Sequence, residues 1–271
     1  MNLFSRSYGH GPALIIVHGL YGASDNWVSI AKELADHFEV FLIDQRNHGR
    51  SPHNPLHTYE SMKEDLLEFM DTMKIQQAVL IGHSMGGKTV MHFAKDYPER
   101  VSSLVVVDIA PVSYLETAMH RKHSINHFEI ISALKSVDFE KITSRQEVED
   151  QLASTIHSER IFKFLMKNLH RLEGNRFTWS LNVAALEENL TAILDGLNEQ
   201  EFAKGKGITG FPVLFIRGGN SDYISKDVFN DIILTIFPFA ELVTIPDASH
   251  WVHVEQPALL IKTLKYFIYE S

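Results

Sequence analysis

A serine flanked by glycines, in Gly82-His83-Ser84-Met85-Gly86, carries the clearest chemical meaning in this sequence. An apolar run at 78–81 precedes the motif, and a segment of helical character follows it. This context is typical of a nucleophile elbow, a sharp strand-to-helix turn that exposes a serine hydroxyl and needs small residues two positions to either side. The motif therefore predicts that Ser84 is a nucleophile and that the backbone N–H of Met85 is free to bind an oxyanion.

A serine hydroxyl at neutral pH needs a base that removes its proton. His250 follows a predicted strand at 242–245, the place where a catalytic histidine is expected in this arrangement. A buried carboxylate must then hold the imidazole in the correct tautomer. Asp108 and Asp222 both follow predicted strands, and their spacing alone leaves either one possible as the acid.

A second motif, His18-Gly19-Leu20-Tyr21-Gly22, directly follows the apolar run at 13–17. A loop of small residues in this position can direct a backbone N–H at a developing oxyanion. We expect Leu20 to supply this donor and Met85 to supply the second one.

The segment at 82–89 also satisfies the P-loop pattern, in which glycine amides cradle phosphates and a lysine, here Lys88, reaches the outer ones. Asp108 would then be the carboxylate that holds magnesium. The two interpretations differ in other residues, because a P-loop enzyme needs neither His18-Gly19 nor His250.

The hydrophobic pattern predicts an α/β fold in which a doubly wound, mostly parallel sheet has helices on both sides. Near-continuous apolar runs are typical of strands buried on both faces, and the segments between them show helical spacing. The predicted strands are 13–17, 40–43, 78–81, 104–107, 213–216 and 242–245, and the predicted helices around them are 27–38, 59–73 and 257–269.

Residues 111–209 interrupt this pattern with helical periodicity at 124–134, 145–157 and 161–172. An insertion at the carboxyl ends of the strands would lie over the crevice where such sheets bind ligands. We therefore predict a core of residues 1–110 and 210–271 and a helical cap of residues 111–209, here called the cap segment. The alternative is a helical excursion that packs outside the core.

Composition narrows the classes of function. The 271 residues are 45% hydrophobic and 22% charged, as in ordinary globular proteins, and the net charge of −9 disfavours nucleic acid and anionic membranes as partners. There is no cysteine, so thiolate catalysis and disulfides are excluded. The N-terminus lacks the apolar core of a signal peptide, and we expect a cytoplasmic protein. We also expect no metal, because His250 and His253 lack a carboxylate at zinc-motif spacing.

Together these residues resemble the α/β-hydrolase superfamily over nearly the whole chain, and most closely the small YbfF-type carboxylesterases. The further segments that carry the resemblance are 44–51 (DQRNHGRS), 107–112 (VDIAPV) and 218–221 (GGNS). The resemblance implies that the cap is inserted after the sixth strand of the fold and that the acid also follows this strand. It thereby favours Asp108 over Asp222.

The resemblance also implies hydrolysis of short- to medium-chain acyl esters, with acyl-CoA thioesters as further candidates, through an acyl-enzyme and without a cofactor. Tyr21 and Trp251 next to the catalytic motifs, and Tyr114 and Trp179 in the cap segment, are the expected substrate contacts. Other interpretations remain open: a carbon–carbon bond hydrolase or lyase with the same triad, since the fold does not select the scissile bond, and a ligand receptor without enzymatic activity.

Overall fold

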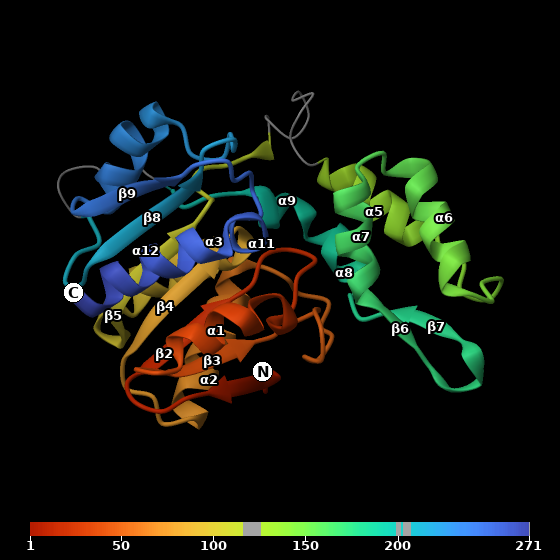
Figure 1. Cartoon of the computed structure of the whole chain (residues 1–271), viewed down its shortest axis with the longest axis horizontal. Coiled ribbons are helices and arrows are strands. Elements are labelled where there is room, and N and C mark those ends of the chain that lie inside the picture. The colour runs from red at the N-terminus through yellow and green to blue at the C-terminus, as the bar shows by residue number, and fades with distance from the viewer. Residues whose placement is uncertain (116–125, 199–201, 203–206, 271) are drawn as a thin grey trace.

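The computed structural model describes residues 1–115, 126–198, 202 and 207–270. Within this part of the chain, seven strands form the main sheet in the order β1-β3-β2-β4-β5-β8-β9 (Figure 1). Only β1 runs antiparallel to its neighbour, and the other pairs are parallel. The strands are β1 (Ser5–Tyr8), β2 (Ala13–Val17), β3 (Glu39–Ile43), β4 (Ala78–His83), β5 (Val101–Val107), β8 (Val213–Gly218) and β9 (Ala240–Ile245). The predicted doubly wound α/β fold is confirmed.

The six predicted strands correspond to β2, β3, β4, β5, β8 and β9, whereas β1 was missed. β1 has the sequence SRSY and pairs only with β3 at the edge of the sheet, so it needs no continuous apolar run. A half-exposed edge strand leaves a weak hydrophobic signal for this reason.

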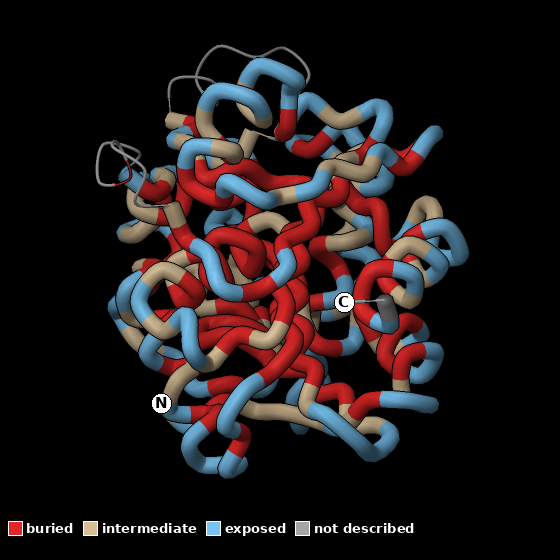
Figure 2. The backbone as a smooth tube through the Cα atoms, turned by 90° about the vertical axis from the view of Figure 1, so that its left-hand side faces the viewer, coloured by how far each residue is buried: buried red, intermediate tan, exposed pale blue. Residues whose placement is uncertain are grey.

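Helices cover both faces of the sheet, because alternate residues of each central strand point to opposite sides. In β2, Leu14 and Ile16 pack in one hydrophobic cluster, and Ile15 and Val17 pack in the other. Figure 2 shows the resulting buried interior, enclosed by exposed loops and helix faces. The first face carries α1 (Val28–Leu34), α11 (Val252–Glu255) and α12 (Pro257–Glu270), and the second carries α2 (Tyr59–Thr72), α3 (Met85–Asp96), the π-helical η6 (Val228–Ile233) and α10 (Leu234–Ile236).

The described helices of the cap segment come after β5 in the chain and lie to one side of the sheet in Figure 1. Its described helices pack around a third hydrophobic cluster that also includes Leu20, Tyr59 and Met85 of the core. The helices therefore cover the region of the elbow. They are α5 (His127–Ser136), α6 (Arg145–Thr155), α7 (Glu159–Leu165), α8 (Val183–Glu188) and α9 (Leu190–Leu194).

The predicted helix at 161–172 was wrong in its second half. α7 ends at Leu165, and a small antiparallel hairpin follows, formed by β6 (Leu169–Arg171) and β7 (Phe177–Trp179). Gly174 lies in the turn between them with a φ of 72°, a conformation that glycine adopts without strain. The domain boundaries near 110 and 210 stay a prediction.

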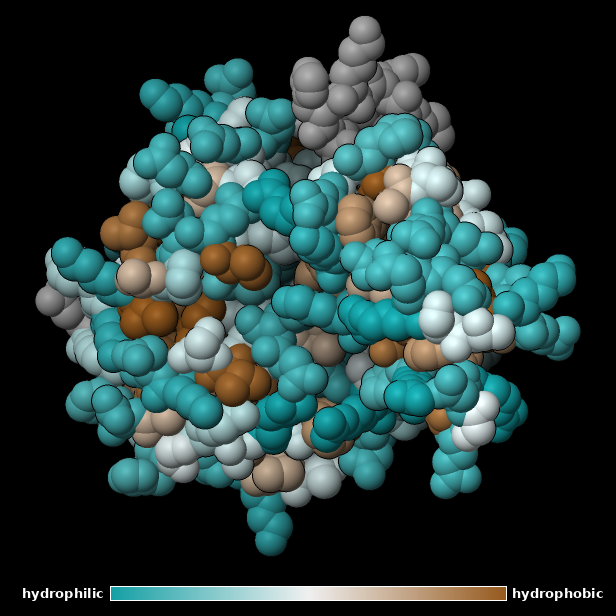
Figure 3. Space-filling view, turned by 45° about the vertical axis from the view of Figure 1, so that its right-hand side comes forward, coloured by the Kyte–Doolittle hydropathy of each residue, from teal (hydrophilic) through white to brown (hydrophobic). Residues whose placement is uncertain are grey.

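Four short 3₁₀ segments complete the described elements: η1 (Ser24–Trp27), η2 (Pro98–Arg100), η3 (Met166–Asn168) and η4 (Glu173–Asn175). On the face drawn in Figure 3, hydrophilic side chains predominate and separate small hydrophobic groups. Among the described helices, none combines the length and the apolar character that crossing a bilayer requires.

Candidate active site

Ser84 occupies the sharp turn between β4 and α3 that the motif predicts. Its backbone has a φ of 53° and a ψ of −120°, which is strained for a residue with a side chain. The flanking glycines permit the turn: a Cβ on Gly82 would lie 2.3 Å from the Gly86 carbonyl oxygen, and one on Gly86 would lie 2.2 Å from the Val17 carbonyl oxygen. No larger residue fits at either position without moving the backbone.

Ser84, His250 and Asp108 form a continuous hydrogen-bonded series. The Ser84 hydroxyl donates to His250 Nε2 at 3.0 Å, and His250 Nδ1 donates to Asp108 Oδ2 at 2.8 Å. Because the carboxylate accepts from Nδ1, the ring proton lies there and Nε2 keeps the lone pair that can take the serine proton. The geometry is that of a nucleophile, a base and an acid.

The two aspartates have different surroundings. Asp108 is fully buried, and it also accepts hydrogen bonds from the Gly218 backbone N–H at 2.8 Å and from the Ser221 hydroxyl at 2.5 Å. Three hydrogen-bond donors thus converge on the Asp108 carboxylate, and these bonds offset the free-energy cost of burying its charge. Asp222 is exposed. The carboxylate bound to His250 is therefore that of Asp108.

Three further residues hold the histidine loop, and the sequence did not single them out. The ring of Tyr223 stacks on that of His250, with centroids 4.1 Å apart. His83 Nε2 donates to the His250 carbonyl oxygen at 2.9 Å, and Ser221 orients the acid. No sequence signal marks these roles, because each depends on loops that are far apart in the chain.

The His18–Gly22 loop is braced by polar contacts. His18 Nε2 accepts from the Gln45 backbone N–H at 3.0 Å, and the Gln45 side chain donates to the His18 carbonyl oxygen at 2.8 Å. The Tyr21 N–H donates to His48 Nε2 at 3.2 Å. Leu20, the predicted oxyanion donor, lines the same cavity as Ser84 and Met85. These contacts hold the loop beside Ser84.

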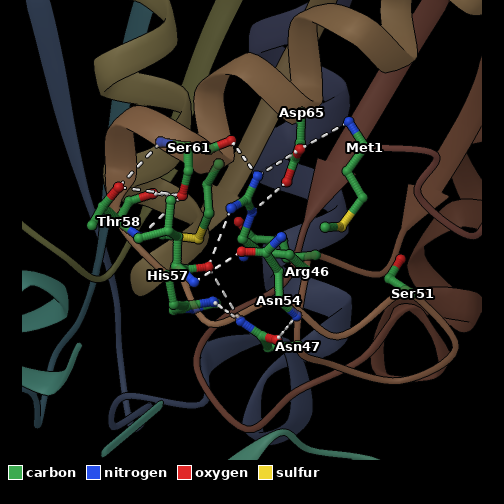
Figure 4. Close-up of polar contacts among 12 residues, drawn as sticks. Met1, Arg46, Asn47, Ser51, Asn54, His57, Thr58, Ser61 and Asp65 are labelled. Carbon is green, nitrogen blue, oxygen red and sulfur yellow. Dashed lines mark hydrogen bonds and ion pairs between the residues drawn. The ribbon is translucent and has the colours of Figure 1, made fainter. Parts of the chain in front are cut away.

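Residues of the 44–51 loop form a polar cluster with residues 54–65 (Figure 4). Arg46 donates to both carboxylate oxygens of Asp65, at 2.6 and 2.8 Å. Asn47 contacts His57 Nδ1 at 3.2 Å, and His57 Nε2 lies 3.3 Å from the sulfur of Met85. The 44–51 loop therefore supports Met85, the residue next to Ser84, through His57.

Several buried histidines of this region are held neutral. Burial lowers the pKa of His18 and lowers that of His48 well below its usual value. Burial, with nearby positive charge, also lowers the pKa of His57 to about 3, and burial with His250 nearby lowers that of His83 to about 3. A neutral ring is required at His18 and His48, because each accepts a backbone N–H.

We expect acid to destabilise the protein before carboxylates titrate. In the unfolded chain a histidine binds protons below pH 6.5, whereas folded His57 and His83 do so only near pH 3. These histidines leave the free energy of unfolding unchanged above pH 6.5. Below this pH the free energy of unfolding falls, by roughly 2 kcal/mol for each such histidine at pH 5. Urea unfolding at pH 7.5, 6 and 5 measures this loss. His57→Gln should reduce the loss, whereas His10→Gln, at an exposed position, should not. Equal stability at pH 7.5 and 5 would contradict the prediction.

A cavity of about 480 Å³ opens beside Ser84 and His250. Part of its wall is apolar, and polar residues, several of them exposed, line the rest. The apolar wall consists of Leu20, Tyr59, Met85, Ile109, Tyr114, Ile130, Ile156, Ile161, Ile193, Leu194 and Trp251. A volume of this size suits a small organic molecule.

The structure separates the four predicted substrate contacts. Tyr114 and Trp251 line the cavity. Tyr21 lines instead a small adjoining space of about 20 Å³. Trp179 packs inside the cap segment, where its indole N–H donates to the Leu134 carbonyl oxygen at 2.9 Å. Of the four, only Tyr114 and Trp251 are among the described residues that line the larger cavity, and substrate contact by any of the four stays a prediction.

Comparison with known proteins gives consistent matches over nearly the whole chain. A zebrafish (Danio rerio) sn-1-specific diacylglycerol lipase, ABHD11, is 37% identical over 266 residues, which is 96% of this chain and 79% of that protein. Esterase YbfF of Escherichia coli is 33% identical over 255 residues, 94% of this chain and 92% of that protein. The solved structure of a marine microorganism esterase matches with a TM-score of 0.89 and 44% identity over 98% of both chains.

The fold overturns the P-loop interpretation of residues 82–89, because the turn after β4 presents a serine side chain bonded to His250. The model of the alpha/beta hydrolase fold family matches residues 12–257. With the strand order, the elbow and these relatives, the chain belongs to the α/β-hydrolase fold family.

Proposed function

We propose that the protein is a serine carboxylesterase that cleaves short- to medium-chain acyl esters, with acyl-CoA thioesters as a second substrate class. The observation that carries this proposal is the hydrogen-bonded series Ser84–His250–Asp108 at the wall of a cavity of about 480 Å³ that is lined in part by apolar side chains. The names of the relatives, an esterase and a lipase among them, support carboxylic ester hydrolysis.

In the proposed reaction, Ser84 Oγ attacks the ester carbonyl carbon while His250 Nε2 takes the hydroxyl proton. The carbonyl oxygen becomes an oxyanion, and the backbone N–H groups of Leu20 and Met85 donate to it. The C–O bond to the alcohol breaks, and the imidazolium gives its proton to the leaving oxygen. Water, deprotonated by His250, then attacks the acyl-enzyme carbonyl, the C–O bond to Ser84 breaks, and the imidazolium returns its proton to Ser84 Oγ as the acid leaves. Asp108 stabilises the imidazolium in both steps.

The cavity supports the proposed chain length. Its apolar wall, including Ile109, Ile130 and Ile193, favours an acyl chain over a polar substituent. Its volume of about 480 Å³ lies toward the lower part of the range for small-molecule pockets. Acyl chains beyond medium length would extend past this wall, and their hydrolysis should be slower.

A series of p-nitrophenyl esters from acetyl to palmitoyl tests the proposal. We expect kcat/KM to peak at a short or medium chain and to fall at least roughly tenfold at palmitoyl, since about 1.4 kcal/mol of lost binding has this effect. The matching acyl-CoA series tests the thioester class. Cleavage of a β-diketone panel without ester cleavage would instead favour the carbon–carbon hydrolase, which uses the same triad.

A further inference from the structure

Lys88 is a buried lysine on the nucleophile helix that the ester chemistry does not use. It lies one turn beyond Ser84 in α3, with its backbone N–H 3.1 Å from the Ser84 carbonyl oxygen, and its side chain is 2% exposed. Nζ donates to the carbonyl oxygens of Val112 at 2.9 Å and Leu194 at 3.2 Å, and also to that of Asp195.

These acceptors belong to the two places where the chain passes between the core and the cap segment. Residues 111–115, the outgoing crossing, lead away from β5, and residues 194–197, the returning crossing, begin at the last residue of α9. The Tyr114 N–H donates to the Leu194 carbonyl oxygen at 2.8 Å, and the Leu197 N–H donates to the Pro111 carbonyl oxygen at 3.0 Å. The crossings are thus bonded to each other, and Lys88 ties both to the nucleophile helix.

All three N–H bonds of the ammonium are occupied, so the group has no spare donor for a phosphate or a substrate. The rings of Tyr114 and Tyr59 lie 4.8 and 5.8 Å from Nζ, a further contact that favours the cation. Burial lowers the pKa of Lys88 to about 7, against the opposing effect of Asp195. An ammonium at this depth costs more than an apolar side chain of the same length, and its polar contacts must offset this cost.

The same residues form part of the cavity wall. Lys88, Tyr59, Tyr114 and Leu194 all line the cavity beside Ser84. A displacement of either crossing would move this wall. We propose that Lys88 is a positioning residue that clamps both crossings onto the nucleophile helix and thereby sets the acyl chain length that the cavity accepts. The chain-length part rests on the proposed function.

The absence of cysteine from the chain allows a matched chemical test. In Lys88→Cys, the single thiol is alkylated in denaturant with 2-bromoethylamine or with 1-bromopropane, and each product is refolded. The two side chains have the same number of heavy atoms, and they differ only in a terminal ammonium or methyl group. Lys95→Cys, on the same helix and half-buried, receives the same two treatments as the control.

Two measurements are made on each product: hydrogen exchange at the Tyr114 and Leu197 amides, and the p-nitrophenyl ester series. We expect exchange at least tenfold faster in the propyl form of Lys88→Cys and an ester optimum at least two carbons longer, with wild-type behaviour restored in the aminoethyl form. The two forms of Lys95→Cys should agree with each other. Tyr59→Phe, which removes a 2.6 Å bond to the Ile193 carbonyl oxygen, should shift both measurements in the same direction, about threefold in exchange.

Equal exchange and equal ester profiles in the two forms of Lys88→Cys would overturn the clamp. Faster exchange with an unchanged profile would overturn its effect on chain length. If the propyl form does not refold, Tyr59→Phe decides: an unchanged profile overturns the proposal. If no form hydrolyses any ester while exchange still differs, the proposed function fails and the clamp stands.

Discussion

Ser84→Ala should lower kcat for p-nitrophenyl ester hydrolysis by roughly 10⁶-fold, the loss typical when a triad nucleophile is removed. Alanine has no hydroxyl to attack the ester, and the remaining oxyanion donors and cavity support only slow attack by water. His250→Ala should lose a similar amount, because the two residues act as one unit. Steady-state kinetics at saturating ester measures both variants.

Ser132→Ala, at an exposed position of α5, is the matched control and should keep wild-type turnover. Thermal unfolding verifies that each variant is folded. A fluorophosphonate should add one covalent group to the wild type and none to Ser84→Ala, which distinguishes an active enzyme from a ligand receptor on the same fold. Ester turnover within tenfold of wild type in Ser84→Ala would contradict the proposed mechanism.

The second large effect is expected at the acid. Asp108→Asn should lower kcat by roughly 10⁴-fold, as in other triads, because the Asn amide can donate to Nδ1 and leave the proton on Nε2. In that tautomer, His250 has no lone pair facing Ser84. The Gly218 backbone N–H, which donates to Asp108 Oδ1 in the wild type, can donate to the side-chain carbonyl of Asn in the variant. The fold should therefore be retained.

Asp222→Asn is the matched control for the acid, since it makes the same change at an exposed residue that lines the cavity. We expect kcat within about threefold of wild type, because the Asp222 side chain is exposed and His250 Nδ1 donates to Asp108 instead. Kinetics of both variants from pH 6 to 9 provides the comparison. A larger loss in Asp222→Asn, or equal mild losses in both, would show that the acid is wrongly assigned.

Much of the core was predictable because its signals are local. The apolar runs that became β2, β4, β5 and β8 are buried on both faces, and this burial demands a continuous run that any window of the sequence reveals. The elbow is equally local, since Gly82 and Gly86 face steric contacts within a few residues of Ser84 or in the adjacent strand.

Elements that are only partly buried, or too short to show a hydrophobic pattern, were missed or were assigned the wrong secondary structure. β1 lies half-exposed at a sheet edge, and β6 falls within the segment at 161–172 that was predicted as helix, because a strand of three residues is too short to show a period of its own. Trp179 is an aromatic residue of the kind expected to contact a substrate. Its ring packs inside the cap segment, where the indole N–H donates to the Leu134 carbonyl oxygen. Aromatic character alone does not tell which side of a helical layer a ring faces.

The sequence by itself determined the fold class and predicted Ser84 as the nucleophile and His250 as the base, because these follow from periodicity, turn sterics and the order of motifs along the chain. Only the tertiary structure decided which aspartate reaches His250. Asp108 and His250 are 142 residues apart, and their contact depends on strand register and loop direction. The tertiary structure also decided the partners of Lys88, which are backbone carbonyls of distant segments. The local sequence, two glycines followed by this lysine, is the same whether the side chain faces a phosphate or such carbonyls.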